Sequence, residues 1–339
     1  MATIKDVARL AGVGLGTASR VISGKGAVAP ATVDRVKRAI EQLEFRPSHA
    51  ARSLLSGRSQ MIGVYIPVLK GTFYTPILRV INTELQANGQ HMVVAFGHGQ
   101  GDARQQVLEG IQFLFERGCD GLLVISDALT DEDLASLGPR SKQLVVINRN
   151  YQVIRDQCFY VDHRKGGRLA AAMLIEAGHK NFAIISGPTT SQDNAARLAG
   201  FVKVLESHGI DPGSISIAHG DYSSESGWIA AGELMDSGRK FTALFCANDE
   251  MAIGALSRFK EAGVNVPTDV SVLGYDDTPA AEYTAPRLTS VHVPWYDVTL
   301  NALRWLLNHC YGTMFTVKRR FPIRVIHRAS VATLAEPRT

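Results

Sequence analysis

The sequence has 339 residues, of which 45% are hydrophobic and 20% charged, and this is the composition of a soluble globular protein of roughly two or three domains. Its four cysteines are widely spaced and form no C-x-x-C pair, so neither a disulfide framework nor a zinc site is expected. No apolar run is long enough to span a bilayer and no leader-like segment opens the chain, so a cytoplasmic protein is predicted.

Charge is distributed unevenly along the chain. The formal net charge is +4, but residues 1–60 alone carry ten Lys or Arg against four Asp or Glu, a net of +6. The rest of the chain carries a net of −2. A basic segment before a nearly neutral body is typical of a polyanion-binding module joined to a separate domain. A solvated pair of helices is the plain alternative, and charge alone does not exclude it.

The first predicted elements are three short helices. The apolar residues with the spacing of one helix face are Ile4, Val7, Ala8 and Ala11. Gly12 ends this helix, a second is predicted over 15–22, and a third over 31–43. Two short helices with a glycine turn and a longer bracing helix form a helix-turn-helix unit, whose second helix enters the major groove of DNA. That helix presents Leu15, Gly16, Thr17, Ser19 and Arg20.

Gly12, Gly14 and Gly16 are also spaced like part of a nucleotide-binding glycine loop. Such a loop must follow a β-strand, whereas residues 6–11 are predicted as helix. No further glycine completes the motif. A nucleotide site is therefore rejected.

The stretch TIKDVARLAGVGLGTASRVISG resembles the DNA-binding head of the lactose/galactose repressor family of bacterial transcriptional regulators. Residues 44–57, EFRPSHAARSLLSG, are similar to the hinge of that family, and the resemblance continues along the whole chain, closest to the galactose-repressor branch. It implies that Leu15 and Gly16 select operator bases and that Leu54 wedges between base pairs in the minor groove, rather than being an ordinary linker residue. The other DNA-contacting residues that it implies are Thr3, Thr17, Ser19, Arg20, Ser48, His49, Ala51 and Arg52.

The chain departs from the family pattern within the second helix. Gly14 stands where a capping serine is usual, Gly16 lies inside the helix, and Ala18 replaces a valine. An interior glycine costs about 1 kcal/mol relative to alanine, so the head is expected to be less stable than those of its relatives. Gly16 also has no side chain with which to read a base, so the operator of a relative does not transfer to this chain.

After residue 60, short apolar runs alternate with helical stretches. Predicted strands are 61–66, 91–96, 121–126, 144–148, 182–186, 215–218, 241–246 and 270–275. Predicted helices are 76–88, 103–117, 131–137, 164–177, 192–208, 225–237 and 249–262. Two successive sets of this kind indicate an α/β body of two doubly wound parallel-sheet lobes, with a ligand at the carboxyl ends of the strands. The resemblance implies the same periplasmic-binding-protein-like architecture.

The predicted organisation is a helix-turn-helix head over 1–46, a hinge over 47–59, and an effector-binding and dimerisation domain over 60–339. Lobe 1 is expected to take about 60–160 plus 292–320, and lobe 2 about 162–290 plus 322–339, with crossings near Val161, 291–293 and 318–323. The leucine-heptad helix that joins some relatives into tetramers is not found at the C-terminal end, so a homodimer is predicted.

Candidate effector-binding residues lie just after the predicted strands or at matching family positions. They are Phe73, Tyr74, Asn148, Arg149, Arg197, Tyr222, Asn248, Asp276 and Trp295, with Asp249 beside Asn248. Aromatic rings stack on the C–H face of a sugar, and Asp, Asn and Arg pair with its hydroxyls, so a monosaccharide or glycoside is the predicted effector. Core packing is the alternative for the aromatic residues, and a surface or interlobe ion pair is the alternative for Arg197 and Asp276.

No catalytic motif is found in the sequence. Asp162 and His163 are adjacent, but a structural hydrogen bond is predicted for them rather than a metal or acid–base pair. The basic run at 318–320 is predicted to lie on a solvated crossing segment. No cofactor and no metal are expected, and the chain is not expected to be an enzyme.

The leading hypothesis is a dimeric transcriptional repressor that binds a near-palindromic operator in double-stranded DNA and responds to a sugar, without a membrane role. A purine-type corepressor or a phosphocarrier protein as the signal stays open, and both release and recruitment of DNA stay open. The I-N-R segment at 147–149 and Asp276 favour a sugar. A sugar-processing enzyme lacks a nucleophile–base pair, and a transport receptor does not fit the basic head.

Overall fold

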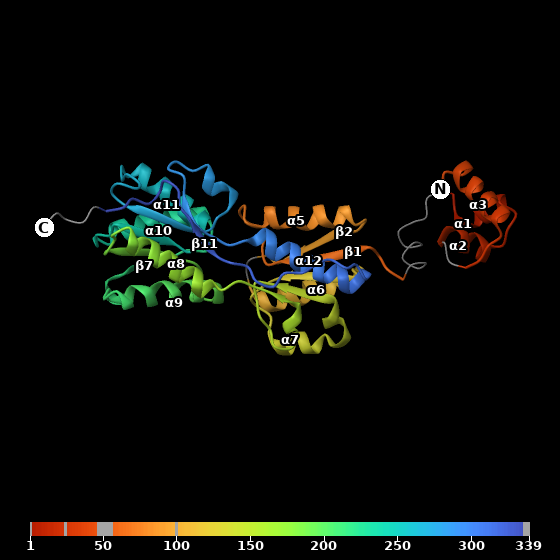
Figure 1. Cartoon of the computed structure of the whole chain (residues 1–339), viewed down its shortest axis with the longest axis horizontal. Helices are drawn as coiled ribbons and strands as arrows, with labels where there is room; N and C mark the ends of the chain where they lie inside the picture. The colour runs from red at the N-terminus through yellow and green to blue at the C-terminus, as the bar shows by residue number, and fades with distance from the viewer. Residues whose placement is uncertain (1, 24–25, 46–56, 99–100, 335–339) are drawn as a thin grey trace.

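The computed structural model describes residues 2–23, 26–45, 57–98 and 101–334. Most of the predicted hinge, residues 47–56, lies outside these ranges. The predicted DNA contacts outside the described residues are Ser48, His49, Ala51, Arg52 and Leu54. Figure 1 shows a small helical head and two larger α/β lobes.

The head consists of α1 (Ile4–Leu10), α2 (Leu15–Ser23) and α3 (Pro30–Gln42). The first helix begins at a capping box, in which the Thr3 hydroxyl accepts from the backbone N–H of Asp6 and the Asp6 carboxylate accepts from that of Thr3. The head has a small core of its own, in which Val7, Ala11, Val36 and Ala39 are buried and Val21 of α2 packs against them. The predicted helix-turn-helix is confirmed.

The first lobe is built on a parallel sheet in the order β2-β1-β3-β4-β5. Its strands are β1 (Met61–Ile66), β2 (His91–Phe96), β3 (Gly121–Ile125), β4 (Leu144–Ile147) and β5 (Cys158–Phe159). Its helices are α6 (Ala103–Glu116) and α7 (Asp131–Ser136) on one face, and α5 (Tyr74–Ala87) and α12 (Trp295–Tyr311) on the other. Because α12 comes from the end of the chain, this lobe is completed by a distant segment (Figure 1).

The second lobe is built on a sheet in the order β11-β10-β9-β8-β6-β7. Its strands are β6 (Phe182–Ser186), β7 (Ser216–His219), β8 (Ala243–Cys246), β9 (Ser271–Asp276), β10 (Thr289–His292) and β11 (Arg324–Ile326). Its helices are α8 (His163–Glu176) and α9 (Gln192–Ser207) on one face, and α10 (Ser224–Asp236) and α11 (Asp249–Glu261) on the other. Short 3-10 helices occupy Gly138–Gln143, Arg155–Gln157, Pro212–Ser214 and Pro279–Glu282.

One strand departs from the predicted parallel pattern. β11 runs antiparallel to β10 at the edge of the second sheet. The chain leaves the second lobe after β10, forms α12 on the first lobe and then returns, so β11 starts at the junction where β10 ends. The two strands therefore have opposite directions. The α/β fold class with two doubly wound lobes is confirmed.

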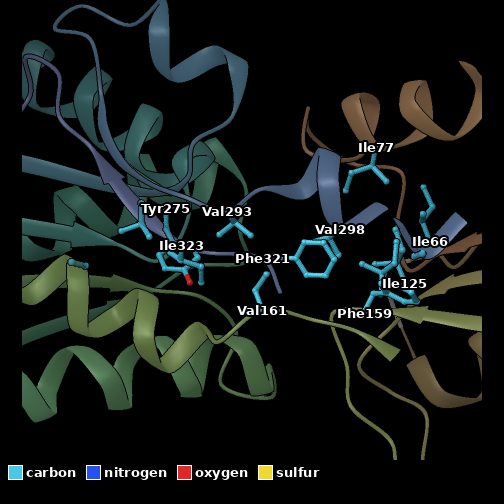
Figure 2. Packing of buried hydrophobic residues seen from close by; sticks show 14 of the residues in the cluster. Ile66, Ile77, Ile125, Phe159, Val161, Tyr275, Val293, Val298, Phe321 and Ile323 are labelled. Carbon is cyan, nitrogen blue, oxygen red and sulfur yellow. The ribbon is translucent and has the colours of Figure 1, made fainter. Parts of the chain in front are cut away.

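The chain passes between the lobes three times, after β5, after β10 and after α12. Val161, Val293 and Phe321 lie on these segments and are buried, and they continue one hydrophobic cluster from the first lobe into the second (Figure 2). The three crossing segments are therefore packed together by apolar side chains. The residue boundaries of head, hinge and lobes remain a prediction.

Candidate functional site

The exposed side of α2 carries residues that were predicted to read DNA. Leu15 is 47% exposed, and Gly16 and Arg20 are exposed too, whereas Ala18 is fully buried against the head. The half-buried members of the predicted set are Thr17 and Ser19. Arg20 is folded back on its own helix, where its Nε donates to the carbonyl of Gly16 at 3.2 Å.

Thr3 has a structural task in the head. Its hydroxyl donates to the Asp6 carboxylate at 2.6 Å, and Arg9 Nη2 donates to the same carboxylate at 2.7 Å. The Thr3 side chain holds the pKa of Asp6 below its ordinary value. Thr3 thus caps α1, and its contact with DNA remains a prediction.

The nine residues predicted to bind an effector converge at the junction of the lobes. The first lobe contributes Phe73, Tyr74, Asn148 and Arg149, with Trp295 at the start of α12. The second lobe contributes Arg197, Tyr222, Asn248 and Asp276. Hydrogen bonds, ring contacts or electrostatic interactions connect seven of them to one another. Asn148 and the adjacent Arg149 join this group through His163, which contacts both Asn148 and Arg197.

Arg197 on α9 lies at the centre of this site and is only 5% exposed. Its Nη1 donates to the carbonyl of Ala247 at 2.5 Å, and its guanidinium lies 4.0 Å from the centre of the Tyr275 ring. Its Nη2 is 3.6 Å from Asp276 Oδ1. The side chain is thus held from three directions. Because both members of the pair are buried and belong to the second lobe, a surface or interlobe ion pair is excluded.

Asp276 ends β9 with a left-handed backbone, at φ +101. The indole N–H of Trp295 donates to Asp276 Oδ1 at 3.2 Å, so this carboxylate is shared between the arginine and the tryptophan. Burial raises the pKa of Asp276 to about 6, although Arg197 acts in the opposite direction. Burial therefore makes this carboxylate easier to protonate than an exposed aspartate.

Aromatic rings of the first lobe pack around Trp295. Phe73 packs edge-on against Trp295, with ring centres 5.4 Å apart, and against Tyr74 at 5.1 Å. Burial raises the pKa of Tyr74, and the negative charges of Asp127 on the first lobe and Asp193 on the second raise it further. Tyr74 therefore lies among acidic groups from both lobes.

His163 connects the lobes through hydrogen bonds, as predicted for the Asp162–His163 pair. Its Nδ1 is 2.9 Å from the Tyr275 hydroxyl and its Nε2 is 2.8 Å from Asn148 Oδ1. Burial, followed by the charges of Arg197 and Arg149, holds the pKa of His163 well below 6.5. The ring is neutral at pH 7. Within the described ranges, no group of three or more His, Cys, Asp or Glu is placed to hold a metal ion.

Asp193 on α9 belongs to the site but was not among the predicted residues. It accepts hydrogen bonds from Asn148 Nδ2 and Arg149 Nη1 on the first lobe. A second carboxylate, Asp127, lies 3.3 Å from Arg149 Nη2. One signal in the sequence does point to Asp193, because it precedes Arg197 by four residues and so shares a helix face with it.

A second pair of contacts joins the lobes beside the site. The backbone N–H and the hydroxyl of Thr72 donate to Glu250 Oε1 at 2.5 and 2.6 Å. Lys70 Nζ lies 2.9 Å from Asp221 Oδ2. These contacts attach the loop before α5 to the second lobe, and the sequence contained no signal for them.

Asn248 and Tyr222 have structural contacts in addition to their predicted role. The Asn248 carboxamide caps α11 by accepting from the backbone N–H of Met251 at 3.0 Å, and it donates to the carbonyl of Tyr222 at 2.9 Å. The Tyr222 hydroxyl donates to Ser191 at 3.0 Å. Tyr222 itself has a left-handed backbone, at φ +70. The start of α11 and the Tyr222 loop are thus fixed to one another.

Comparison with known proteins gives the same two parts. Residues 3–48 match the bacterial regulatory proteins of the lacI family, and residues 171–331 match the periplasmic binding protein-like domain. The transcriptional regulator AscG of Escherichia coli K12 is 32% identical, over 98% of this chain and 98% of its own. The regulator GalS of Salmonella typhimurium is 32% identical, over 98% of this chain and 97% of its own.

Solved structures agree. A LacI-family transcriptional regulator from Burkhoderia phymatum is 49% identical, has a TM-score of 0.77 and covers 80% of this chain and 99% of its own. The lac repressor dimer bound to operator and the anti-inducer ONPF is 27% identical, has a TM-score of 0.83 and covers 98% of this chain and 99% of its own. Because the head, the two lobes and the relatives along its full length agree, this chain belongs to the lacI family of bacterial regulatory proteins and is a DNA-binding transcriptional repressor, not an enzyme.

Proposed function

We propose that a small sugar, a monosaccharide or a glycoside, binds between the two lobes and controls the affinity of this repressor for its operator. The observation that carries the proposal is the buried Arg197–Asp276 pair beside Trp295, with Phe73 packed edge-on to that tryptophan. The guanidinium and the carboxylate supply donors and acceptors for neighbouring hydroxyls, and the aromatic rings supply apolar surface for C–H groups. A ligand at this junction contacts both lobes and so favours one arrangement of them.

Similar proteins support a sugar as the effector. The transcriptional regulator CelR, solved in complex with cellobiose, is 31% identical with a TM-score of 0.66. The lac repressor bound to ONPG in the repressed state is 27% identical with a TM-score of 0.81. The repressor PurR of Vibrio atlanticus is 32% identical over 98% of this chain, so a purine-type corepressor is the alternative, beside a protein partner.

The test is the melting temperature across a panel of sugars, sugar phosphates and purines, for the wild type, Arg197→Ala and the control Arg168→Ala. Arg168 is a half-exposed residue of the neighbouring helix α8. A ligand at about 100 times its dissociation constant stabilises the folded state by about 2.7 kcal/mol. A sugar response lost only in Arg197→Ala supports the proposal. A purine response replaces it with corepression, and silence from a normally folded protein contradicts the proposed sugar and points to a protein partner or a metabolite outside the panel.

We propose that α2 reads a near-palindromic operator through Leu15, Gly16, Thr17, Ser19 and Arg20, with Thr3 and the hinge residues adding further contacts. Support comes from the exposure of Leu15, Gly16 and Arg20 on one helix of a basic head. Replacing Arg20 by Ala in the full chain is expected to weaken binding to a selected operator by about 1–3 kcal/mol and to relax specificity at one position. Uniform weakening on all sequences contradicts a base contact. Since its partner is DNA, we propose that the protein acts in the cytoplasm.

We propose that the repressor is a homodimer formed through its body. A mainly apolar groove of about 560 Å³ runs between α5, the start of α12 and the Pro279–Glu282 turn. Tyr296 lines it and is 62% exposed, which suits an interface between copies. Sedimentation of Tyr296→Glu is expected to show monomers, while Tyr160→Glu, at a 45% exposed position outside the groove, stays dimeric. A dimeric Tyr296→Glu protein contradicts this interface.

Control of DNA binding by a sugar is a coupling between two sites, and such coupling is reciprocal. Operator DNA must change the affinity for the sugar by the same factor by which the sugar changes the affinity for DNA. Titrations of the sugar with and without operator measure this factor. Equal sugar affinities in the two titrations contradict the proposed mechanism.

A further inference from the structure

Behind Asp276 lies a second carboxylate, Asp249, which is fully buried at the start of α11. Its Oδ2 accepts hydrogen bonds from the backbone N–H of Thr278 at 2.6 Å and from the Thr278 hydroxyl at 3.1 Å. Its Oδ1 accepts from the Ser290 hydroxyl at 2.6 Å. Asp249 thus joins three segments of the second lobe, namely α11, the loop after β9, and β10.

These hydrogen bonds surround the part of the loop that carries the site carboxylate. Asp276 and Asp277 are two successive left-handed residues, at φ +101 and +56. Non-glycine residues adopt this conformation only at a cost in free energy, and they keep it when neighbouring contacts hold them. Such contacts are present here, because Ser290 Oγ accepts from the backbone N–H of Asp277 at 3.1 Å and donates to Asp249. The strained pair is therefore held through Ser290 on one side and Thr278 on the other.

The sequence leaves room for this carboxylate. A Cβ atom at Gly274, inside β9, would lie 2.3 Å from Asp249 Oδ1. A glycine within a strand often marks such a close approach. Burial raises the pKa of Asp249 to about 8, while the three donors and the N-terminus of α11 favour the ionised form. A buried carboxylate is unfavourable unless it is hydrogen-bonded, and here the three donors belong to Thr278 in the loop and to Ser290 in the strand beside it.

We propose that Asp249 is a positioning residue, which fixes the backbone of residues 276–278 and thereby sets the Asp276 carboxylate against Arg197 and Trp295. The consequence for effector binding rests on the proposed function, whereas the hold on the loop is independent of any effector. Asn248 caps the same helix. The start of α11 therefore positions two predicted effector contacts, Asn248 directly and Asp276 through Asp249.

The first test is hydrogen exchange of the backbone amides of Asp277 and Thr278 in the full-length protein. In Asp249→Asn, an NH₂ group replaces one of the two carboxylate oxygens that accept hydrogen bonds. In Ser290→Ala, the hydroxyl that accepts from the backbone N–H of Asp277 is removed. Each change is expected to speed exchange of these amides about tenfold or more. In the double variant the two effects are expected to be less than additive, since both act through one loop.

The matched control is Phe259→Leu, at the other end of α11, where Phe259 packs against Phe241. It is expected to lower the melting temperature without changing exchange at residues 277 and 278. Trp295 gives a second readout in a Trp228→Phe, Trp305→Phe background, because the sequence has three tryptophans. Asp249→Asn is expected to shift the Trp295 emission to longer wavelength, and Phe259→Leu is not. Unchanged exchange and unchanged emission in Asp249→Asn overturn the proposal.

The effector consequence is measured by titration with D-galactose and with methyl β-D-glucopyranoside. For a sugar that binds the wild type, Asp249→Asn is expected to weaken affinity about tenfold or more and to have no further effect in an Asp276→Asn background. Unchanged affinity overturns the effector consequence. If the wild type binds neither sugar, the result counts against the proposed function for these two sugars. The exchange and emission results then still decide whether Asp249 positions the loop.

Discussion

At the scale of single residues, two glycines of the head illustrate how backbone conformation decides the effect of a substitution. Gly12 has φ +63 and forms the turn after α1, so any side chain there is strained. Gly16 lies within α2, and a Cβ atom built on it meets no atom within 4 Å. The same residue type is therefore required at one position and only tolerated at the other.

Gly16→Ala is expected to stabilise the head by about 1 kcal/mol, because alanine loses less backbone entropy than glycine in a helix. Hydrogen exchange of the α2 amides in the full chain measures the effect as about fivefold greater protection. The control, Gly12→Ala, is expected to reduce protection. Loss of protection in Gly16→Ala would contradict the open space at this position.

His163 gives a prediction about pH. The unfolded chain binds a proton on this histidine below about pH 6.5, whereas in the folded protein burial holds its pKa far lower. The stabilisation from the neutral buried ring is thus complete above the unfolded pKa and is lost as the pH falls below it. The expected loss is at most about 1.4 kcal/mol per pH unit.

Urea unfolding of the wild type and His163→Gln at several pH values between 7 and 5 isolates this contribution. The difference in unfolding free energy between the two is expected to shrink as the pH falls, because glutamine does not titrate. Burial raises the pKa of Asp276 on folding, which acts in the opposite direction, but this group is common to both proteins and cancels in the difference. His208→Gln, at an exposed position, is the control for the substitution itself. A constant difference for His163→Gln rules out the neutral ring.

At the scale of elements, glycines allow two pairs of helices in the second lobe to approach closely. A Cβ atom at Gly167 on α8 would lie 1.9 Å from the carbonyl oxygen of Arg197 on α9, and one at Gly200 would lie 2.0 Å from that of Arg164. Between α10 and α11, a Cβ atom at Gly227 would lie 2.2 Å from the carbonyl oxygen of Met251, and one at Gly254 would lie 1.9 Å from that of Ser224. Backbone thus meets backbone at both interfaces, and Arg197 lies directly on one of them.

Gly200→Ala is expected to move α9 away from α8, since a methyl group cannot fit against a carbonyl oxygen at that distance. Overpacking of this kind costs about 1–3 kcal/mol, and the melting temperature should fall accordingly. The control is Gly232→Ala on α10, where the new Cβ would meet only the flexible Arg258 side chain, at 3.2 Å. Similar melting temperatures for the two variants would contradict a backbone-limited interface.

The long elements of this fold could be predicted from sequence because their apolar pattern is strong. Continuous apolar strands such as Met61–Ile66 are buried in all but the first residue, and the helices between them show the apolar spacing of one buried helix face. The two-residue β5 and the three-residue β11 were not predicted, because such short segments gain their structure from pairing with distant strands. β10, with the mixed sequence TSVH, was missed for the same reason.

The candidate site could be placed from sequence because the carboxyl ends of parallel strands meet at one edge of a sheet. Asp276 and Asn248 were found in this way. Asp193 and Glu250 were not, since each lies on a helix and its contacts are with the other lobe. Asp249 was placed beside the site, but nothing local shows that it faces Thr278 and Ser290. Contacts between elements that are far apart in sequence need the folded structure.

At the scale of the whole molecule, the lobes are joined on one side by three chain crossings and on the other by polar contacts. The crossings at Val161, Val293 and Phe321 are packed with apolar side chains and suit a pivot about which the lobes rotate (Figure 2). The polar contacts on the open side come from Thr72–Glu250, Lys70–Asp221 and Asn148–Asp193. Opening of the lobes therefore requires these polar contacts to break while the chain crossings stay packed.

Glu250→Ala is expected to shift the lobes toward an open arrangement. It removes both hydrogen bonds from Thr72 to a buried carboxylate, and the loss of about 3 kcal/mol lowers the ratio of closed to open molecules about a hundredfold. Lys70→Ala is the matched control on the same loop. The Lys70–Asp221 pair is about half exposed, so it contributes about 0–1 kcal/mol.

Small-angle X-ray scattering in solution distinguishes the two variants. The radius of gyration of Glu250→Ala is expected to exceed that of the wild type, whereas that of Lys70→Ala is expected to match it. If the proposed effector binds between the lobes and favours the closed arrangement, Glu250→Ala is also expected to weaken effector affinity without a direct contact with the effector. An unchanged radius of gyration together with unchanged affinity would mean that the packed chain crossings, and not the polar contacts, set the closure of the lobes.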